Sequence, residues 1–212
     1  MTVHFDIKSF DDLSEKYSTW IIKYCSTSFD SPLFLIWYTD SEKSSTNNLL
    51  TFENGEIFAV KSLADIRETV IASIDLLIKF KNLYPWLDNF NNLEVREFTT
   101  YDIITVANSI RINNLDILTI EGLSNYFNLY DDFVDQDENN AHFQKISHNE
   151  VVEKVLNYFY NHIFWPRFND KDKFEALDRP VLDIDTKKLL SVLNEIMKAF
   201  DSKIRLIDKA IC

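Results

Sequence analysis

Glycine is scarce in this sequence: only Gly55 and Gly122 occur among its 212 residues. A Walker A phosphate loop and a dinucleotide-binding fingerprint each need several glycines within a few residues, because there the backbone must approach a phosphate without a Cβ in the way. Two isolated glycines cannot supply either motif. The sequence therefore excludes these two kinds of nucleotide-binding site.

Cysteine is just as scarce, and the histidines are poorly placed for metal binding. Cys25 and Cys212 are too few for a disulfide framework or for the paired cysteines of a zinc site. His142 and His148 do not have the i, i+4 spacing that puts two ligands on one face of a helix. We therefore predict no bound cofactor and no metal site built from histidine and cysteine.

Positively charged residues are outnumbered, with 22 Lys and Arg against 34 Asp and Glu and a formal net charge of −12. Nucleic-acid affinity comes mainly from Lys and Arg that displace counterions from phosphates, so we expect no direct binding to DNA or RNA. The longest apolar run, Leu33–Tyr38, is far too short to span a bilayer, and Met1–Leu13 lacks the basic and apolar regions of a signal peptide. We expect a soluble cytoplasmic protein that does not bind membranes.

Hydrophobic residues, in contrast, make up 46% of the chain and aromatic residues 14%, which is ample for a folded core. Apolar alternation and β-branched or aromatic runs predict strands over Thr2–Ile7, Thr19–Tyr24, Leu33–Tyr38 and Leu93–Phe98. Asn54-Gly55 between two apolar runs predicts a hairpin with a type I′ turn, in which both residues take positive φ.

From Ser62 onward the apolar residues recur with a helical period of about 3.6. Capping residues predict helix starts at Ser62, Thr100, Thr119, Ser147 and Asp185, the last helix continuing to Ile207. Asp135–Asn140 is predicted as a polar loop, and Phe164–Leu182 as an irregular segment bounded by prolines. We predict one α+β domain over residues 1–212, β-rich over 1–61 and mainly helical over 62–212. An N-terminal antiparallel sheet with a hairpin is followed by a C-terminal helical layer packed on it.

An acidic run offers the main candidate chemistry. Asp131, Asp132 and Asp135 have the DDxxD spelling of the metal–diphosphate motif in prenyl-diphosphate and terpene enzymes, and their oxygens could bind Mg²⁺. Such enzymes are nearly all helical, whereas the first third of this chain is predicted to be β. A metal-dependent enzyme acting on a phosphorylated or diphosphate substrate is therefore the alternative hypothesis.

The same run is placed where a helix favours cations, because the macrodipole is negative at a helix C-terminus. A basic protein partner would offset this charge. Trp165 and Arg167 lie in a segment that breaks the helical period, and Trp and Arg are favoured interface anchors. We therefore predict a partner-binding face that contains Asp131, Asp132, Asp135, Asp137, Glu138, Trp165 and Arg167.

Two segments carry a resemblance to a known family. Leu50–Ile66 combines the hairpin with a helix that starts at serine, and Tyr126–Phe133 reads Tyr-Phe-Asn-Leu-Tyr-Asp-Asp-Phe. Both resemble segments of the immunity proteins of bacterial contact-dependent growth inhibition systems. The resemblance implies a cytoplasmic protein that is not an enzyme. It would bind and neutralise one cognate toxin domain, often a basic nuclease, by covering its active site; it leaves the oligomeric state open.

Overall fold

The computed structural model describes residues 9–40, 46–90, 99–176 and 178–207. The chain divides into two compact units: residues 1–100 with 203–212, here called the sheet unit, and residues 101–202, here called the helical unit. A six-stranded sheet and many helices confirm the predicted α+β fold class. The boundary between the units falls at residue 100, whereas the sequence placed the change from strands to helices at residue 62. The predicted strands Thr2–Ile7 and Leu93–Phe98 lie outside the described residues.

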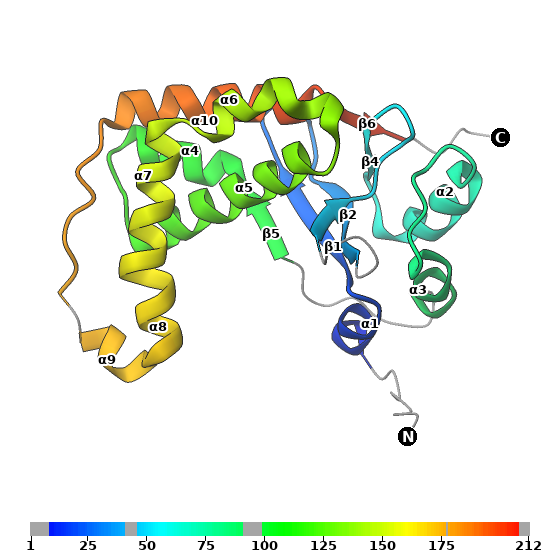
Figure 1. Cartoon of the computed structure of the whole chain (residues 1–212), viewed down its shortest axis with the longest axis horizontal. Coiled ribbons are helices and arrows are strands. Elements are labelled where there is room, and N and C mark those ends of the chain that lie inside the picture. The colour runs from blue at the N-terminus through cyan, green and yellow to red at the C-terminus, as the bar shows by residue number, and fades with distance from the viewer. Residues whose placement is uncertain (1–8, 41–45, 91–98, 177, 208–212) are drawn as a thin grey trace. The chain divides into compact units, whose positions relative to one another are not determined.

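Strand β2 is the centre of the sheet, because it pairs with three other strands (Figure 1). β1 lies antiparallel to β2, with Thr19 opposite Tyr38 and Tyr24 opposite Leu33. β3 pairs with the second half of β2 and β4 with its first half, both antiparallel. The order is β5-β1-β2-β4-β6. The strands are β1 (Thr19–Cys25), β2 (Leu33–Asp40), β3 (Thr46–Leu49), β4 (Ile57–Val60), β5 (Thr99–Asp102) and β6 (Ile204–Leu206).

The sequence had predicted an antiparallel sheet, but strand β6 makes the sheet mixed. β6 pairs parallel with β4, with Ile57 opposite Ile204. The Ile57 N–H donates to the Lys203 carbonyl (2.7 Å), and the Ile207 N–H donates to the Ala59 carbonyl (2.9 Å). The predicted extension of the last helix to Ile207 is therefore wrong, because these apolar residues pair with the edge of β4 instead.

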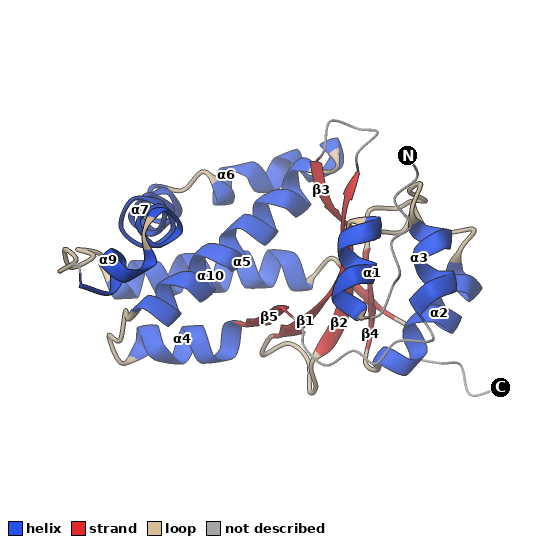
Figure 2. Cartoon of the chain, turned by 90° about the horizontal axis from the view of Figure 1, so that it is seen from below, coloured by secondary structure: helices blue, strands red, loops and turns tan. Residues whose placement is uncertain are grey.

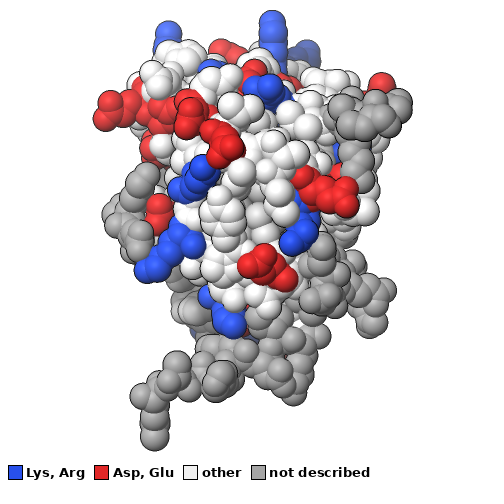
Figure 3. All heavy atoms as spheres, turned by 90° about the vertical axis from the view of Figure 1, so that its right-hand side faces the viewer, with Lys and Arg blue, Asp and Glu red and all other residues white. Residues whose placement is uncertain are grey.

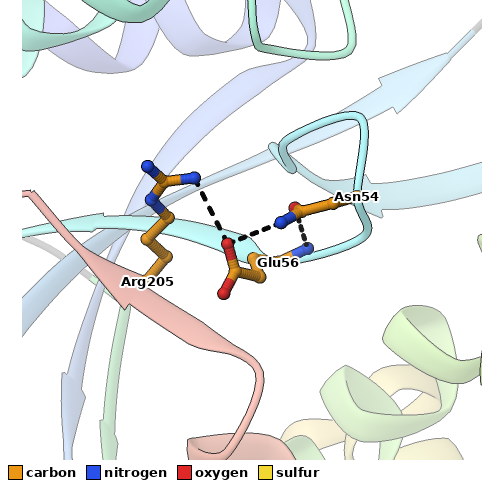
Figure 4. Close-up of polar contacts among 3 residues, drawn as sticks. All are labelled: Asn54, Glu56 and Arg205. Atoms are coloured by element: carbon orange, nitrogen blue, oxygen red, sulfur yellow. Dashed lines mark hydrogen bonds and ion pairs between the residues drawn. The ribbon is translucent and has the colours of Figure 1, made fainter.

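The predicted hairpin is present, but its turn is not type I′. Only Gly55 has positive φ (80°), and Asn54 does not. The Gly55 N–H donates to the Phe52 carbonyl (2.9 Å) and the Phe52 N–H to the Glu56 carbonyl (2.8 Å), the pattern of a three-residue loop with a glycine bulge. The Asn54 side chain accepts from the Glu56 N–H (3.1 Å), so it stabilises this turn. Figure 4 shows that the Glu56 carboxylate also accepts from Asn54 (2.8 Å) and from Arg205 of β6 (3.3 Å).

Three helices cover one face of the sheet in Figure 2: α1 (Phe10–Tyr17), α2 (Ile66–Ser73) and α3 (Leu83–Phe90). α1 begins with a reciprocal capping box, whereas the Ser62 side chain makes no capping bond and precedes the 3₁₀ turn η1 (Leu63–Asp65). The Tyr38 ring stacks on Phe80 with centroids 3.8 Å apart in the core beneath these helices. Burial, with the charge of Asp40 nearby, raises the pKa of Tyr38 to about 12.

Aspartates, rather than the predicted threonines, start the first helices of the helical unit. Asp102 caps α4 through the Thr105 N–H, and Asp116 caps α5 through the Thr119 N–H. The predicted caps Thr100 and Thr119 are wrong by two or three residues, because an ionised carboxylate is a stronger acceptor for helix N–H groups. The first two helices are α4 (Ile103–Arg111) and α5 (Ile117–Asp135).

The later helices follow the predictions in part. Asn149 caps α7 in place of Ser147, whereas Asp185 caps α10 as predicted. The 3₁₀ helix η2 begins within the predicted polar loop and extends three residues beyond it, and the predicted irregular segment contains two short helices. These elements are η2 (Glu138–Phe143), α6 (Gln144–Ser147), α7 (Glu150–Phe159), the π-helical turn η3 (Tyr160–Phe164), α8 (Trp165–Asn169), α9 (Lys171–Ala176) and α10 (Thr186–Asp201).

Candidate protein-binding surface on helix α5

Helix α5 buries one side and presents a polar stripe on the other. On the buried side Tyr126 and Phe133 meet Phe200 of α10 edge to face, at 6.0 and 5.5 Å between centroids. The residues opposite recur at spacings of four and three, which keeps them on one face of an α-helix. Each is exposed or half-buried. These residues, here called the α5 stripe, are Glu121, Asn125, Asn128, Asp132 and Asp135. The stripe contains carboxylates and amides and no positively charged residue.

The predicted acidic residues gather at the end of this helix. Asp131, Asp132 and Asp135 lie in the last five residues of α5, and Asp137 caps η2 through a 2.9 Å bond from a backbone N–H. Asp135 and Glu138 are exposed. In the described ranges no Lys or Arg forms an ion pair with Asp131, Asp135, Asp137 or Glu138. The helix C-terminus adds its own partial negative charge, so the end of α5 is strongly acidic.

Asp131 differs from its neighbours because its carboxyl group is partly buried. Burial raises the pKa of Asp131 above its usual range, and repulsion from Asp135 adds to this. A hydrogen bond with Ser147 and attraction to His148 act in the opposite direction. Within the part of the chain that the structure describes, no group of three or more His, Cys, Asp or Glu side chains could hold a metal ion. Asp131, Asp132 and Asp135 therefore do not converge as a metal–diphosphate motif requires.

Tyr101 provides a neutral hydroxyl beside the stripe. Burial raises its pKa to about 12, and the charge of Asp132 contributes in the same direction. The Tyr101 hydroxyl therefore stays neutral to a higher pH than an exposed tyrosine would.

A π-helical turn directs a second set of side chains to the surface. In Tyr160–Phe164 the hydrogen bonds reach five residues back, from the Trp165 N–H to the Tyr160 carbonyl. Pro166 has no N–H and would clash with the carbonyl four residues earlier in a continuous α-helix, and the wider turn accommodates it. Phe164, Trp165 and Phe168 are 39, 50 and 74% exposed. We call these three residues the aromatic group.

Contacts among its own rings hold the aromatic group together. Phe164 meets Trp165 edge to face at 4.8 Å and stacks with Phe168 at 6.2 Å, and Trp165 meets Phe168 edge to face at 6.0 Å. Such ring pairs contribute about 0.5–1.5 kcal/mol beyond the area they bury. These contacts restrict the positions of the three rings relative to one another.

Arg167, within the same segment, points toward the protein. Its guanidinium pairs with Glu121, the first residue of the α5 stripe, and lies over the Phe174 ring at 4.8 Å. Arg179 covers the same ring at 4.6 Å. Arg167 thus fixes α8, and with it the aromatic group, to the start of the stripe.

The structure places the predicted residues at the two ends of α5. Arg167 contacts Glu121 near its start and Asp135 is its last residue, about 20 Å away at 1.5 Å per residue. The sequence analysis missed Glu121, Phe164 and Phe168. The i, i+4 spacing of Phe164 and Phe168 beside Pro166 was a usable signal for the aromatic group, whereas nothing local indicated Glu121.

The fold defines the chain as an α+β protein with a counterpart among solved structures. It is similar to the C-terminal domain of SatS, seen in a crystal structure in complex with bromine, with a TM-score of 0.57 and 10% sequence identity. The match covers 92% of this chain and 97% of that one, and at this identity it shows a shared fold alone. No protein-family model and no curated protein matches the sequence. Among the described helices, none has the length and apolar composition that crossing a membrane requires.

Proposed function

We propose that this chain is an immunity-type inhibitor that binds a cognate bacterial toxin domain and neutralises it by covering the toxin's active site. The observation that carries the proposal is the aromatic group, which is exposed at one end of the acidic α5 stripe. The resemblance of Leu50–Ile66 and Tyr126–Phe133 to immunity proteins supports the same conclusion.

The aromatic group has the properties of an interface anchor. Trp165 and Phe168 expose half or more of their surface, and large aromatic side chains contribute disproportionately to protein–protein affinity. Their mutual contacts restrict the rings already, so little side-chain entropy is lost on binding. Adjacent exposed rings of this kind are typical of interaction sites rather than of surface that contacts only solvent.

The acidic stripe supports a basic partner. Glu121 is neutralised by Arg167, but Asp135 at the far end is exposed, and the helix terminus adds to its negative potential. A basic surface would be attracted to this end and would associate faster at low salt. Both ends of the stripe lie within the reach of one interface of standard size.

The first step of the test is to sequence the gene upstream, which we expect to encode a large secreted protein. The C-terminal domain of that protein is then the binding partner, with binding measured by calorimetry and neutralisation measured as growth rescue. Trp165→Ala and Phe168→Ala should each weaken binding at least about tenfold, because each removes a central anchor. Tyr84→Ala is the matched control, since Tyr84 is 51% exposed on α3 of the sheet unit. Figure 3 shows that the side of this unit carrying α2 and α3 mixes charges of both signs.

The charge of the surface is tested separately. Asp135→Lys should slow association several-fold and reduce its dependence on salt, with a smaller effect on dissociation. Failure of the upstream toxin domain to bind would refute the proposed function. Unchanged binding by Trp165→Ala would refute the role of the aromatic group.

A further inference from the structure

A groove lies on the helical unit between the start of α5 and the segment before α10. Its volume is about 860 Å³. Asn113–Leu118, which joins α4 to α5 and includes the first two residues of α5, forms one wall, and Arg179–Leu182 with Ile184 forms the other. Ile120 and Tyr158 also line it. A groove of this size has room for several side chains of a ligand.

The first wall is held in place by backbone geometry and side-chain bonds. Asn113 has φ of 56° and ends α4 as a glycine would, with its N–H donating to Ile110 (3.0 Å). Its side chain accepts a 2.7 Å bond from the Thr186 hydroxyl of α10. Asp116 accepts the Thr119 N–H at 2.8 Å, which holds the pKa of Asp116 below its usual range. Asn114 also donates to the Asp116 carboxylate (3.0 Å), so this wall is held in place and carries one carboxylate.

The second wall, here called the strap (Arg179–Asp185), has the alternation of a β-strand without a partner strand. Val181 and Asp183 are exposed, whereas Leu182 is buried and Ile184 half-buried. The Tyr158 hydroxyl anchors the strap by donating to the Pro180 carbonyl (2.7 Å). Among the described residues, the backbone of 181–184 makes no hydrogen bond to another backbone segment. Residues 181–184 of the strap therefore leave a stretch of backbone of about 13 Å open to pairing.

The side chains around the groove define what it can hold. Leu118 and Val181 stand at its rim, 76 and 90% exposed, and most of the lining is aliphatic. Arg179, the cation in the lining, is occupied by the ring and the carbonyl oxygen (3.2 Å) of Phe174. Asp116 contributes a carboxylate to the lining, whereas Lys154 and Lys188 line an adjacent hollow of about 370 Å³ that shares Ile184 with the groove. The groove thus combines an aliphatic lining with a carboxylate that no lysine in the lining offsets.

We propose that this groove binds an extended peptide segment of a protein partner. The segment pairs its backbone with the strap, as in strand addition, and places a branched aliphatic side chain between Leu118 and Val181. A lysine or arginine of the segment lies beside Asp116. This site is additional to the α5 surface and does not depend on the partner being a toxin.

The experiment uses the full chain and a fluorescein-labelled pentapeptide, Lys-Val-Thr-Val-Lys amide, with binding followed by fluorescence anisotropy. Leu118→Asp and Val181→Asp should each weaken binding about tenfold or more, since each places a charge against the aliphatic side chain that the peptide inserts between these two residues. Ile112→Asp is the matched control: Ile112 is also 76% exposed and precedes the groove without lining it, so binding should be unchanged. Substituting both lysines of the peptide with glutamate should weaken binding several-fold.

Three results would overturn the proposal. The peptide does not bind, or it binds equally well when every backbone N–H is methylated, which excludes strand pairing. Alternatively, the chain is a dimer in sedimentation that Leu118→Asp converts to a monomer, so that a second copy occupies the groove. Because no toxin is present in this experiment, its outcome is independent of the test of the proposed function.

Discussion

Gly122 is a position where one added methyl group tests the packing of α4 against α5. A Cβ built there would lie 2.8 Å from Cγ2 of Val106 on α4. Carbon atoms at this distance repel, since their optimal separation is about 3.5–4.0 Å. Val106 is a buried β-branched residue with one strongly preferred rotamer in a helix, so it cannot rotate away at low cost.

Two effects of opposite sign follow from Gly122→Ala. Replacing glycine by alanine inside a helix stabilises the folded chain by about 1 kcal/mol. Overpacking a tight contact costs about 1–3 kcal/mol. Because the neighbouring side chain is stiff and buried, we expect the second effect to win and the free energy of unfolding to fall by about 1 kcal/mol.

Urea unfolding of the full chain, followed by circular dichroism, measures this change, and Val106→Ala supplies the control. In the Val106→Ala background the new methyl group has space, so Gly122→Ala should raise the free energy of unfolding by up to about 1 kcal/mol. The double-mutant cycle should therefore give a coupling of about 2 kcal/mol. Stabilisation by Gly122→Ala alone, or the same effect in both backgrounds, would refute the close approach of the two helices.

Two further predictions concern a helix cap and two tyrosines. Asp116→Ala should lower the free energy of unfolding by about 1 kcal/mol at neutral pH in urea titrations, and Asp116→Asn by less, because asparagine keeps a capping oxygen. Folding lowers the pKa of Asp116 below 3.8, so the ionised carboxylate stabilises the folded chain fully above pH 3.8. This stabilisation is lost as the pH falls through the lower pKa of the folded state. An equal loss of stability in Asp116→Ala near about pH 2 would contradict this explanation. Burial raises the pKa of Tyr38 and Tyr101 from 10.0 to about 12, so Tyr38→Phe and Tyr101→Phe should leave the ultraviolet phenolate signal at about pH 11 unchanged. The contribution of these two tyrosines to the free energy of unfolding is fully present below pH 10 and is lost as the pH rises toward 12. A reduced phenolate signal at about pH 11 in either variant would show that the tyrosine has an ordinary pKa.

The parts of the fold that local residues determine could be predicted from the sequence. β1, β2, the hairpin and the cap Asp185 follow from alternation, turn residues and capping chemistry within a few positions. The turn type was wrong because the Asn54 side chain bonds to Glu56, which the dipeptide alone does not indicate. β6 was missed because its partner, β4, is far away along the chain.

In the candidate site, too, the features set by nearby residues could be predicted, whereas those that depend on tertiary contacts could not. The acidic end of α5 follows from the charges of Asp131 and Asp135 and from the helix period. Trp165 was found because Pro166 interrupts that period, although the π-helical turn that exposes the ring depends on the packing of the whole segment. The ion pair of Arg167 with Glu121 is a tertiary contact between residues far apart in the sequence, so no local spacing indicates it.

The parallel pairing of β6 with β4 determines the order in which the sheet unit can be completed during synthesis. Residues 101–202 are made before β6, so β4 lacks its outer neighbour until the entire helical unit has left the ribosome. All four residues of β4 are buried in the folded chain, and an open apolar strand edge is where aggregation begins. Rapid folding of the helical unit, whose contacts are largely between neighbouring helices, would shorten this exposed interval. A fragment that ends at residue 100 would keep the open edge permanently.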